Sequence, residues 1–304
     1  MITRRQLLAF GAAVAASRRA FAQEAQTVAG SGEAGTARVP VAGSGEAGTA
    51  RMPTAYVGHG SPLLATDPIR RAELRAWGAT LPRPTGIVAL TPHWRARGLH
   101  IGHLGRGRAL RSFPSFMDKM VPRSLDYPSP DNTALAHVVA DLLAPLEPTF
   151  DAARGGFDHT TWMPLMHLFP GAPVPVVEIA MPFASDQDLF TLGRRLAPLR
   201  RHGVFILASG SMTHNLASIG ERVTPPWALA FDDWASRALA ARDVASLLDW
   251  RAKAPDADLA HPDDGGHFRV IFVALGAVGE GGTARFPVQG FEAGSQSKRC
   301  VELT

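Results

Sequence analysis

Short apolar runs alternate with longer amphipathic runs along this chain from residue 54 onward. The short runs are typical of buried strands, and the long runs, in which apolar residues recur every three or four positions, are typical of helices. This alternation predicts an α/β fold in which helices cover the faces of a sheet. The predicted strands are 54–57, 86–90, 174–179 and 204–208, and the predicted helices are 69–79, 133–146, 186–200, 226–240 and a segment around 268–277.

The first 22 residues have the composition of an export signal. They contain a twin-arginine pair, Arg4-Arg5, then an apolar stretch, then an A-x-A cleavage site at residues 20–22. The apolar stretch has roughly ten residues, about half of what a membrane-spanning helix requires. We therefore predict export by the machinery for folded proteins and a periplasmic protein without stable membrane insertion after signal cleavage. If the signal is not functional, the protein is cytoplasmic.

Residues 23–53 are rich in Gly, Ala and Ser, and the eleven residues 28–38 recur unchanged as residues 41–51. Each copy contains G-x-G-x-x-G, but this pattern indicates a dinucleotide site only where it joins a strand to a helix, and no strand precedes it here. We predict a flexible linker that leads into one folded domain, residues 54–304.

Composition narrows the possible partners. The hydrophobic fraction of 46% is typical of a globular domain with a core. The net charge of +4 is matched by the four arginines of residues 1–22, so the remainder is close to neutral and has no basic run. Nucleic acid is therefore not an expected partner. Cys300 is the single cysteine, which excludes a disulfide within the chain.

Three histidines follow predicted strands: His59 two residues after the first strand, His93 three residues after the second, and His214 a few residues after the fourth. Loops at the carboxyl ends of strands converge on one edge of an open α/β sheet, so these side chains can meet at one point. His159 and His267, which lie outside the strands, are further candidates. A single strand-end histidine is more often a hydrogen-bonded loop residue than a ligand, but three with the same placement favour a shared metal site, since imidazole is a common ligand of first-row metals.

Five stretches in order resemble the class III extradiol ring-cleaving dioxygenases, in particular the DOPA 4,5-dioxygenase-like branch. The resemblance covers nearly the whole folded domain. The matching stretches are Gly58-His59-Gly60-Ser61-Pro62, Pro92-His93-Trp94, Gly156-Phe157-Asp158-His159 with Trp162-Met163-Pro164-Leu165, Ser209-Gly210-Ser211 with Thr213-His214-Asn215-Leu216, and His261-Pro262 with Gly266-His267-Phe268.

The resemblance implies a single-domain, three-layer α/β/α sandwich around a mostly parallel or mixed central sheet. It implies that His59, His93 and His267 bind one Fe(II), or zinc as in some relatives. His214 would be a further ligand or a base behind the ligands, and His159 the other catalytic histidine. The substrate would be a small catecholic ring that is opened with O2 beside its hydroxyls.

Two positions depart from the family pattern. Thr160 stands where relatives usually have glycine, and we expect it to narrow the pocket; Arg269 follows His267-Phe268 in place of an aromatic residue or leucine. If residues 156–160 are extended, Asp158 points away from His159 and is structural rather than an orienting partner.

Two other functions use the same residues. A zinc hydrolase would use the histidine site to generate hydroxide. A non-catalytic periplasmic metal-binding protein would hold an exchangeable ion there. A serine hydrolase is disfavoured because Ser61, Ser209 and Ser211 lie outside a G-x-S-x-G elbow, and small-residue turns account for them.

Overall fold

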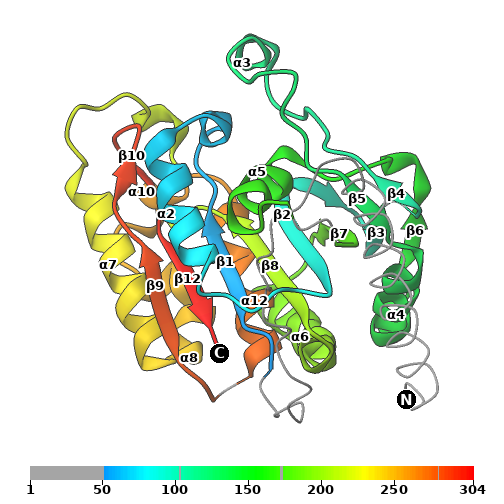
Figure 1. Ribbon diagram of the computed structural model, residues 1–304. Coiled ribbons are helices and arrows are strands. Elements are labelled where there is room, and N and C mark those ends of the chain that lie inside the picture. Colours follow the sequence, from blue (N-terminus) through cyan, green and yellow to red (C-terminus); the bar gives the residue numbers. More distant parts are fainter. Residues whose placement is uncertain (1–50, 103, 172–173, 280) are drawn as a thin grey trace, which may run out of the picture. The chain divides into compact units, whose positions relative to one another are not determined.

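The computed structural model describes residues 51–102, 104–171, 174–279 and 281–304. An eight-stranded sheet forms the centre of this part of the chain, in the order β6-β3-β7-β2-β8-β1-β12-β9 (Figure 1). The four inner strands β7, β2, β8 and β1 are parallel, whereas β3 and β12 run antiparallel to their inner neighbours. The strands are β1 (Thr54–Gly58), β2 (Gly86–Ala96), β3 (His100–Gly102), β6 (Thr149–Asp151), β7 (Val176–Pro182), β8 (Val204–Gly210), β9 (Ala284–Val288) and β12 (Cys300–Leu303).

Helices cover both faces of the sheet. Alternate residues of a strand point to opposite faces, and β1 shows this directly. Ala55 and Val57 belong to the apolar cluster formed with α2 (Pro68–Gly78) and α5 (His159–Leu168). The hydroxyl of Thr54 instead donates to a carbonyl oxygen of α12 (Ile271–Val278), which packs against α6 (Asp186–Leu196) on the other face. The predicted α/β/α sandwich with a mixed sheet is confirmed.

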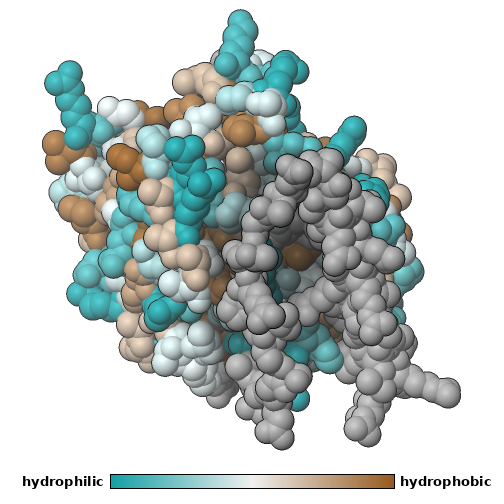
Figure 2. All heavy atoms as spheres, in the orientation of Figure 1, coloured by the Kyte–Doolittle hydropathy of each residue, from teal (hydrophilic) through white to brown (hydrophobic). Residues whose placement is uncertain are grey.

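The inner strands are mostly apolar because both of their faces are covered. All residues of β1 and β8 are buried, as are the first six of β2. Strands covered on two sides need continuous apolar sequence rather than alternation. On the visible part of the face in Figure 2, apolar and polar residues are interspersed. The described residues include no helix that is both long and apolar enough to cross a membrane.

All four predicted strands and five predicted helical segments are present, with shifted ends. The helices are α2, α4 (Thr133–Leu143), α6, α7 (Pro226–Ala241), and α11 (Gly266–Arg269) followed by α12. The predicted ends at 146 and 200 were placed too late for the α-helices, because 3-10 turns, Ala144–Leu146 and Ala197–His202, follow α4 and α6. The short outer strands β3, β6, β9 and β12 were not predicted.

One boundary error matters for the site. The sequence predicted that His93 follows a strand ending at residue 90, but β2 continues to Ala96. Its pairing with β7 shifts between Thr91 and Arg95, which face consecutive residues of β7. The three residues between them form a bulge, and such bulges redirect side chains at sheet edges and active sites. His93 therefore lies in a bulge within β2 rather than in a loop.

The predicted export signal and most of the predicted linker lie outside the described residues.

Candidate metal centre

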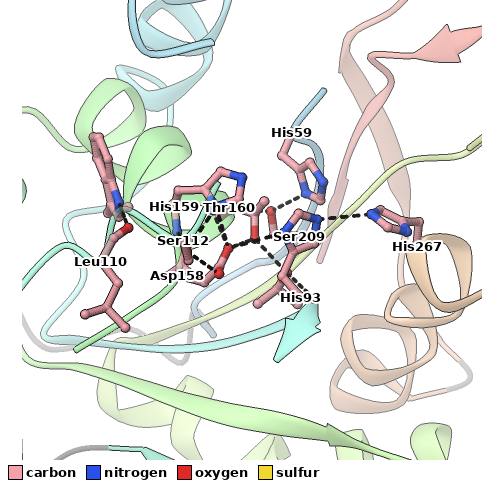
Figure 3. A network of polar contacts seen from close by, with 12 residues as sticks. His59, His93, Leu110, Ser112, Asp158, His159, Thr160, Ser209 and His267 are labelled. Carbon is pink, nitrogen blue, oxygen red and sulfur yellow. Dashed lines mark hydrogen bonds and ion pairs between the residues drawn. The ribbon is translucent and has the colours of Figure 1, made fainter. Parts of the chain in front are cut away.

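Three of the predicted histidines lie close together at the carboxyl ends of the inner strands. His59 directly follows β1, His93 lies in the bulge of β2, and His267 lies in α11. One ring nitrogen of each lies within 4.8 Å of the others. His93 Nε2 is 3.2 Å from His267 Nε2, and Figure 3 shows the rings drawn together from three separate segments.

This set of donors fits a first-row metal ion. Two nitrogens that each lie about 2.1 Å from one ion are about 3.0–3.4 Å apart at octahedral to tetrahedral angles. The separation of 3.2 Å between His93 Nε2 and His267 Nε2 lies in that range. Two imidazole nitrogens facing each other need a proton or a cation between them, since both lone pairs are otherwise directed at each other. The triad can therefore hold a divalent ion.

Burial keeps these three rings neutral. It lowers the pKa of His59 and of His267 well below the ordinary value, and the neighbouring imidazoles lower both further. Burial of the ring lowers the pKa of His93 to about 4 against the opposing effect of the Asp158 carboxylate, although 29% of the His93 side chain is exposed. Neutral imidazole is the form that ligates a metal, so the site can bind an ion at pH 7 without first losing protons.

Hydrogen bonds fix the tautomer of His59. Its Nδ1 lies 3.0 Å from Ser209 Oγ, and Ser209 Oγ lies 2.5 Å from the carbonyl oxygen of Thr160. The carbonyl can only accept, so the single hydroxyl hydrogen of Ser209 is donated there and the hydroxyl oxygen accepts from His59 Nδ1. The proton of His59 is therefore on Nδ1, which leaves the Nε2 lone pair free for an ion.

Two glycines allow the backbone to approach closely around the candidate ligands. Gly60 has a φ of +61°, and a Cβ there would overlap the carboxylate of Glu292, which accepts from Ser61 N. At Gly210, a Cβ would overlap the carbonyl oxygen of His267. That carbonyl oxygen accepts from the Tyr56 hydroxyl and from the backbone N–H of Ser211, which holds the first turn of α11 against the end of β8.

His159 lies beside the triad and is oriented by Asp158. Its ring centroid is 4.9 Å from that of His93. Its Nδ1 lies 3.1 Å from Asp158 Oδ1 and 3.1 Å from Ser112 Oγ, and the Ser112 hydroxyl donates to Asp158 Oδ2 at 2.5 Å. Because Ser112 gives its hydrogen to the carboxylate, Nδ1 of His159 carries its own proton. Within the part of the chain that the structure describes, no hydrogen bond of His159 Nε2 is present, so in the neutral ring its lone pair is free to accept a proton.

The expectation that Asp158 points away from His159 was wrong. The segment is not extended there: Asp158 is the N-cap of α5 and accepts from Thr160 N at 2.9 Å, and His159 is the first helical residue. Burial alone would raise the pKa of Asp158, but hydrogen bonds from His159 and Ser112 lower it well below its ordinary range. The carboxylate therefore stays ionised and serves both as helix cap and as orienting partner.

His214 lies next to the triad in a different arrangement. Its ring stacks on that of His267, with centroids 3.5 Å apart and planes 9° from parallel. The nitrogen lone pairs lie in the planes of the rings. Because the two planes are stacked and nearly parallel, the lone pairs of His214 and His267 do not point to one ion in this arrangement. A nitrogen of His214 also lies within 4.8 Å of ligand atoms of Asp263 and His267. The role of His214 as ligand or base stays a prediction.

The two positions that depart from the family pattern have defined partners. Thr160 is buried, and its hydroxyl donates to Asp158 Oδ1 at 2.7 Å. It also lines a small cavity with His59, His159 and other residues. Arg269 is directed to the start of α6, where it pairs with Asp186 and donates to the Ala184 carbonyl oxygen.

The sequence pattern did not identify the polar residues that lie behind the histidines: Thr91, Ser112 and Ser209. Ser209 was assigned to a small-residue turn, but it orients His59. One signal was available for the orientation of His159: an aspartate directly before a run that can be helical is typical of a helix N-cap, and it places the next residue on the helix. This signal predicts Asp158 as the N-cap of a helix that begins at His159.

Comparison with known proteins agrees with this geometry. A family model described as the catalytic LigB subunit of aromatic ring-opening dioxygenase matches residues 57–298. The chain belongs to this family. The 4,5-DOPA dioxygenase extradiol of Escherichia coli (strain K12) is 30% identical over 263 residues, covering 82% of this chain and 93% of that protein. The protein of the same description from Beta vulgaris is 30% identical over 258 residues, covering 82% and 95%.

A solved structure shares the fold of this LigB-family chain. The crystal structure of an uncharacterized protein from Escherichia coli K12 matches with a TM-score of 0.70 and 29% identity, covering 84% of this chain and 100% of that one. The predicted resemblance is confirmed. The chain is therefore an oxygenase-type enzyme of a family that uses a metal, a small aromatic substrate and O2, and it has a candidate histidine site for that metal.

Proposed function

We propose that this protein opens a catecholic ring in the extradiol position with O2, with Fe(II) as the metal and zinc as the alternative. The observation that carries the proposal is the cluster of His59, His93 and His267 with His159 beside it. The extradiol relatives at 30% identity support the reaction type.

The number and charge of the ligands suit this chemistry. His59, His93 and His267 would hold the ion through three nitrogens, and an ion that accepts about six ligands would then have room for a catechol and O2. When bound, the metal brings the two substrates together and accepts the negative charge of the catecholate. The three imidazoles are neutral, so the ligands do not repel an anionic substrate.

His159 is placed to move protons. Opening a catechol needs a group that takes a proton from a hydroxyl and later returns one to an oxygen, and histidine titrates near neutral pH. With Nδ1 donating toward Asp158 and Ser112, the neutral ring presents the Nε2 lone pair as the acceptor. We therefore assign His159 as the acid/base residue, with His214 as the second candidate.

The test uses the full chain purified without metal. It is loaded anaerobically with Fe(II) or with zinc, then exposed to air with a panel of catechols, including one with an amino-acid side chain. We expect O2 uptake and a yellow ring-opened product with Fe(II). His159→Gln should retain the metal but lose turnover. No product from any catechol with either metal would refute the proposal, and hydrolytic activity with zinc alone would replace it by the hydrolase function.

We also propose that the protein works in the periplasm, on the basis of residues 1–22. Cell fractionation with a twin-lysine variant, Arg4→Lys with Arg5→Lys, tests this, because loss of periplasmic protein is expected only if the arginine pair is read as a signal.

A further inference from the structure

Thr160 lies at the junction of the hydrogen bonds that orient the site. It is buried at the second position of α5, with 1% of its surface exposed. Its hydroxyl lies 2.7 Å from Asp158 Oδ1 and 2.6 Å from Thr91 Oγ1, while its carbonyl oxygen accepts from Ser209 Oγ. One residue therefore contacts the partners of several imidazoles through two different groups.

The direction of the hydroxyl bonds is fixed. An ionised carboxylate only accepts, so the single hydrogen of Thr160 Oγ1 is donated to Asp158 Oδ1. The bond between the two threonines must then be donated by Thr91, whose Oγ1 in turn accepts from His93 N at 3.2 Å. The result is a directed chain from the backbone of His93 through two hydroxyls to the carboxylate that orients His159.

The carbonyl oxygen of Thr160 acts on His59 through Ser209. It receives the hydrogen of Ser209, which forces Ser209 Oγ to accept from His59 Nδ1. Figure 3 shows Thr160 between the His59–Ser209 pair and the Asp158–His159 pair. A displacement of Thr160 would therefore disturb His59 and His159 together.

We propose that Thr160 is a positioning residue that couples the metal ligands His59 and His93 to the acid/base residue His159. Its hydroxyl holds the Asp158 carboxylate and the bulge of β2 together, and its carbonyl holds the tautomer of His59. The inference rests on the proposed function, because it assigns Thr160 to the same site. It gives the hydroxyl a role distinct from narrowing the pocket.

The test compares two substitutions at Thr160. Thr160→Val keeps the shape and removes the hydroxyl, whereas Thr160→Ser keeps the hydroxyl and removes a methyl group. In the valine variant Asp158 loses a donor and Thr91 loses its acceptor, and loss of such partners behind a ligand typically costs 10–100-fold in metal affinity. The full-length apoprotein is titrated with Co(II) in competition with a chelator, and the visible spectrum of the bound Co(II) reports the ligand geometry.

Thr161→Val is the matched control. Thr161 is the next residue of α5, is equally buried, and donates its hydroxyl to the Glu178 carboxylate at 2.7 Å. The two valine variants each remove one buried hydroxyl-to-carboxylate bond, and Thr160→Val also removes the acceptor of the Thr91 hydroxyl, so it should lose at least as much free energy of unfolding as the control. Only the variant at Thr160 should change Co(II) affinity and spectrum.

We expect Thr160→Val to bind Co(II) at least 10-fold more weakly with an altered spectrum, while Thr160→Ser stays within about threefold of wild type. If the valine variant does not fold, Thr160→Ala removes the same hydroxyl and is judged by the same criteria. Unchanged affinity and spectrum in the folded variant would overturn the inference while leaving the proposed function intact. Wild type that neither binds Co(II) nor cleaves a catechol with Fe(II) would overturn both.

Discussion

Substituting Asp158 by asparagine should change the tautomer of His159, the proposed acid/base residue, while keeping the helix that Asp158 caps. The carboxylate accepts from Thr160 through one oxygen and from Ser112 Oγ through the other, and His159 Nδ1 lies 3.1 Å from the first. Asparagine with its oxygen at the first position keeps the cap of α5, because Asn and Asp cap helices about equally well. Its amide nitrogen would then face Ser112 as a donor.

The Ser112 hydroxyl would then have to donate elsewhere. His159 Nδ1, at 3.1 Å, is an acceptor within reach, which would move the proton of a neutral His159 to Nε2, the nitrogen that we expect to accept the substrate proton. General acid–base catalysis contributes about 10²–10⁴-fold, so we expect kcat to fall by about 100-fold. One charge-assisted bond of a buried carboxylate is lost, which should cost about 1.5–3 kcal/mol of the free energy of unfolding.

Steady-state kinetics of the Fe(II)-loaded enzyme and urea unfolding of the apoprotein measure the two effects. Asp67→Asn is the control, since Asp67 caps α2 through Ile69 N and Arg70 N and has no imidazole partner among the described contacts. Asp158→Asn with kcat within threefold of wild type would refute the orienting role of the carboxylate. A large loss of kcat in the Asp67 variant would show that capping alone accounts for the effect.

Two further predictions concern packing and pH. Gly210→Ala should weaken Co(II) binding by about 10-fold or more, because the new Cβ overlaps the His267 carbonyl oxygen. Gly281→Ala is the control and should bind Co(II) like wild type, because its new Cβ meets no atom within 4 Å. Equal Co(II) affinities of Gly210→Ala and wild type would contradict the close approach. Burial lowers the pKa of His261 from 6.5 to about 4 in the folded protein, so the unfolded chain takes up the proton first and stability is lost as the pH falls from 6.5 to 4. His261→Gln removes this titration. The free energy of unfolding, measured by urea unfolding, should therefore fall by about 2 kcal/mol less between pH 7 and pH 5 in this variant than in wild type. The same fall in both proteins would refute the prediction.

The sequence by itself determined the class of fold and the candidate ligands. Runs such as 86–90 and 204–208 are apolar throughout, and only strands covered on both faces need such runs, so the inner strands were predictable from local pattern. The position of His59 directly after the first inner strand could be read from the local sequence as well. The outer strands β3, β6, β9 and β12 could not be predicted from local pattern. They have three to five residues of mixed polarity, and such strands form by pairing with neighbours that lie far away in the sequence.

The tertiary structure decided how the histidines are used. Which nitrogen of His59 is left free as a candidate ligand depends on Ser209 and on the carbonyl of Thr160, 49 residues before Ser209. The orientation of His159 depends on Ser112, 47 residues away, and the stacking of His214 on His267 depends on the packing of the loop after β8 against α11. A sequence pattern reports periodicity within one segment, whereas hydrogen-bond direction and ring orientation are set by contacts between segments, and only the folded chain brings those together.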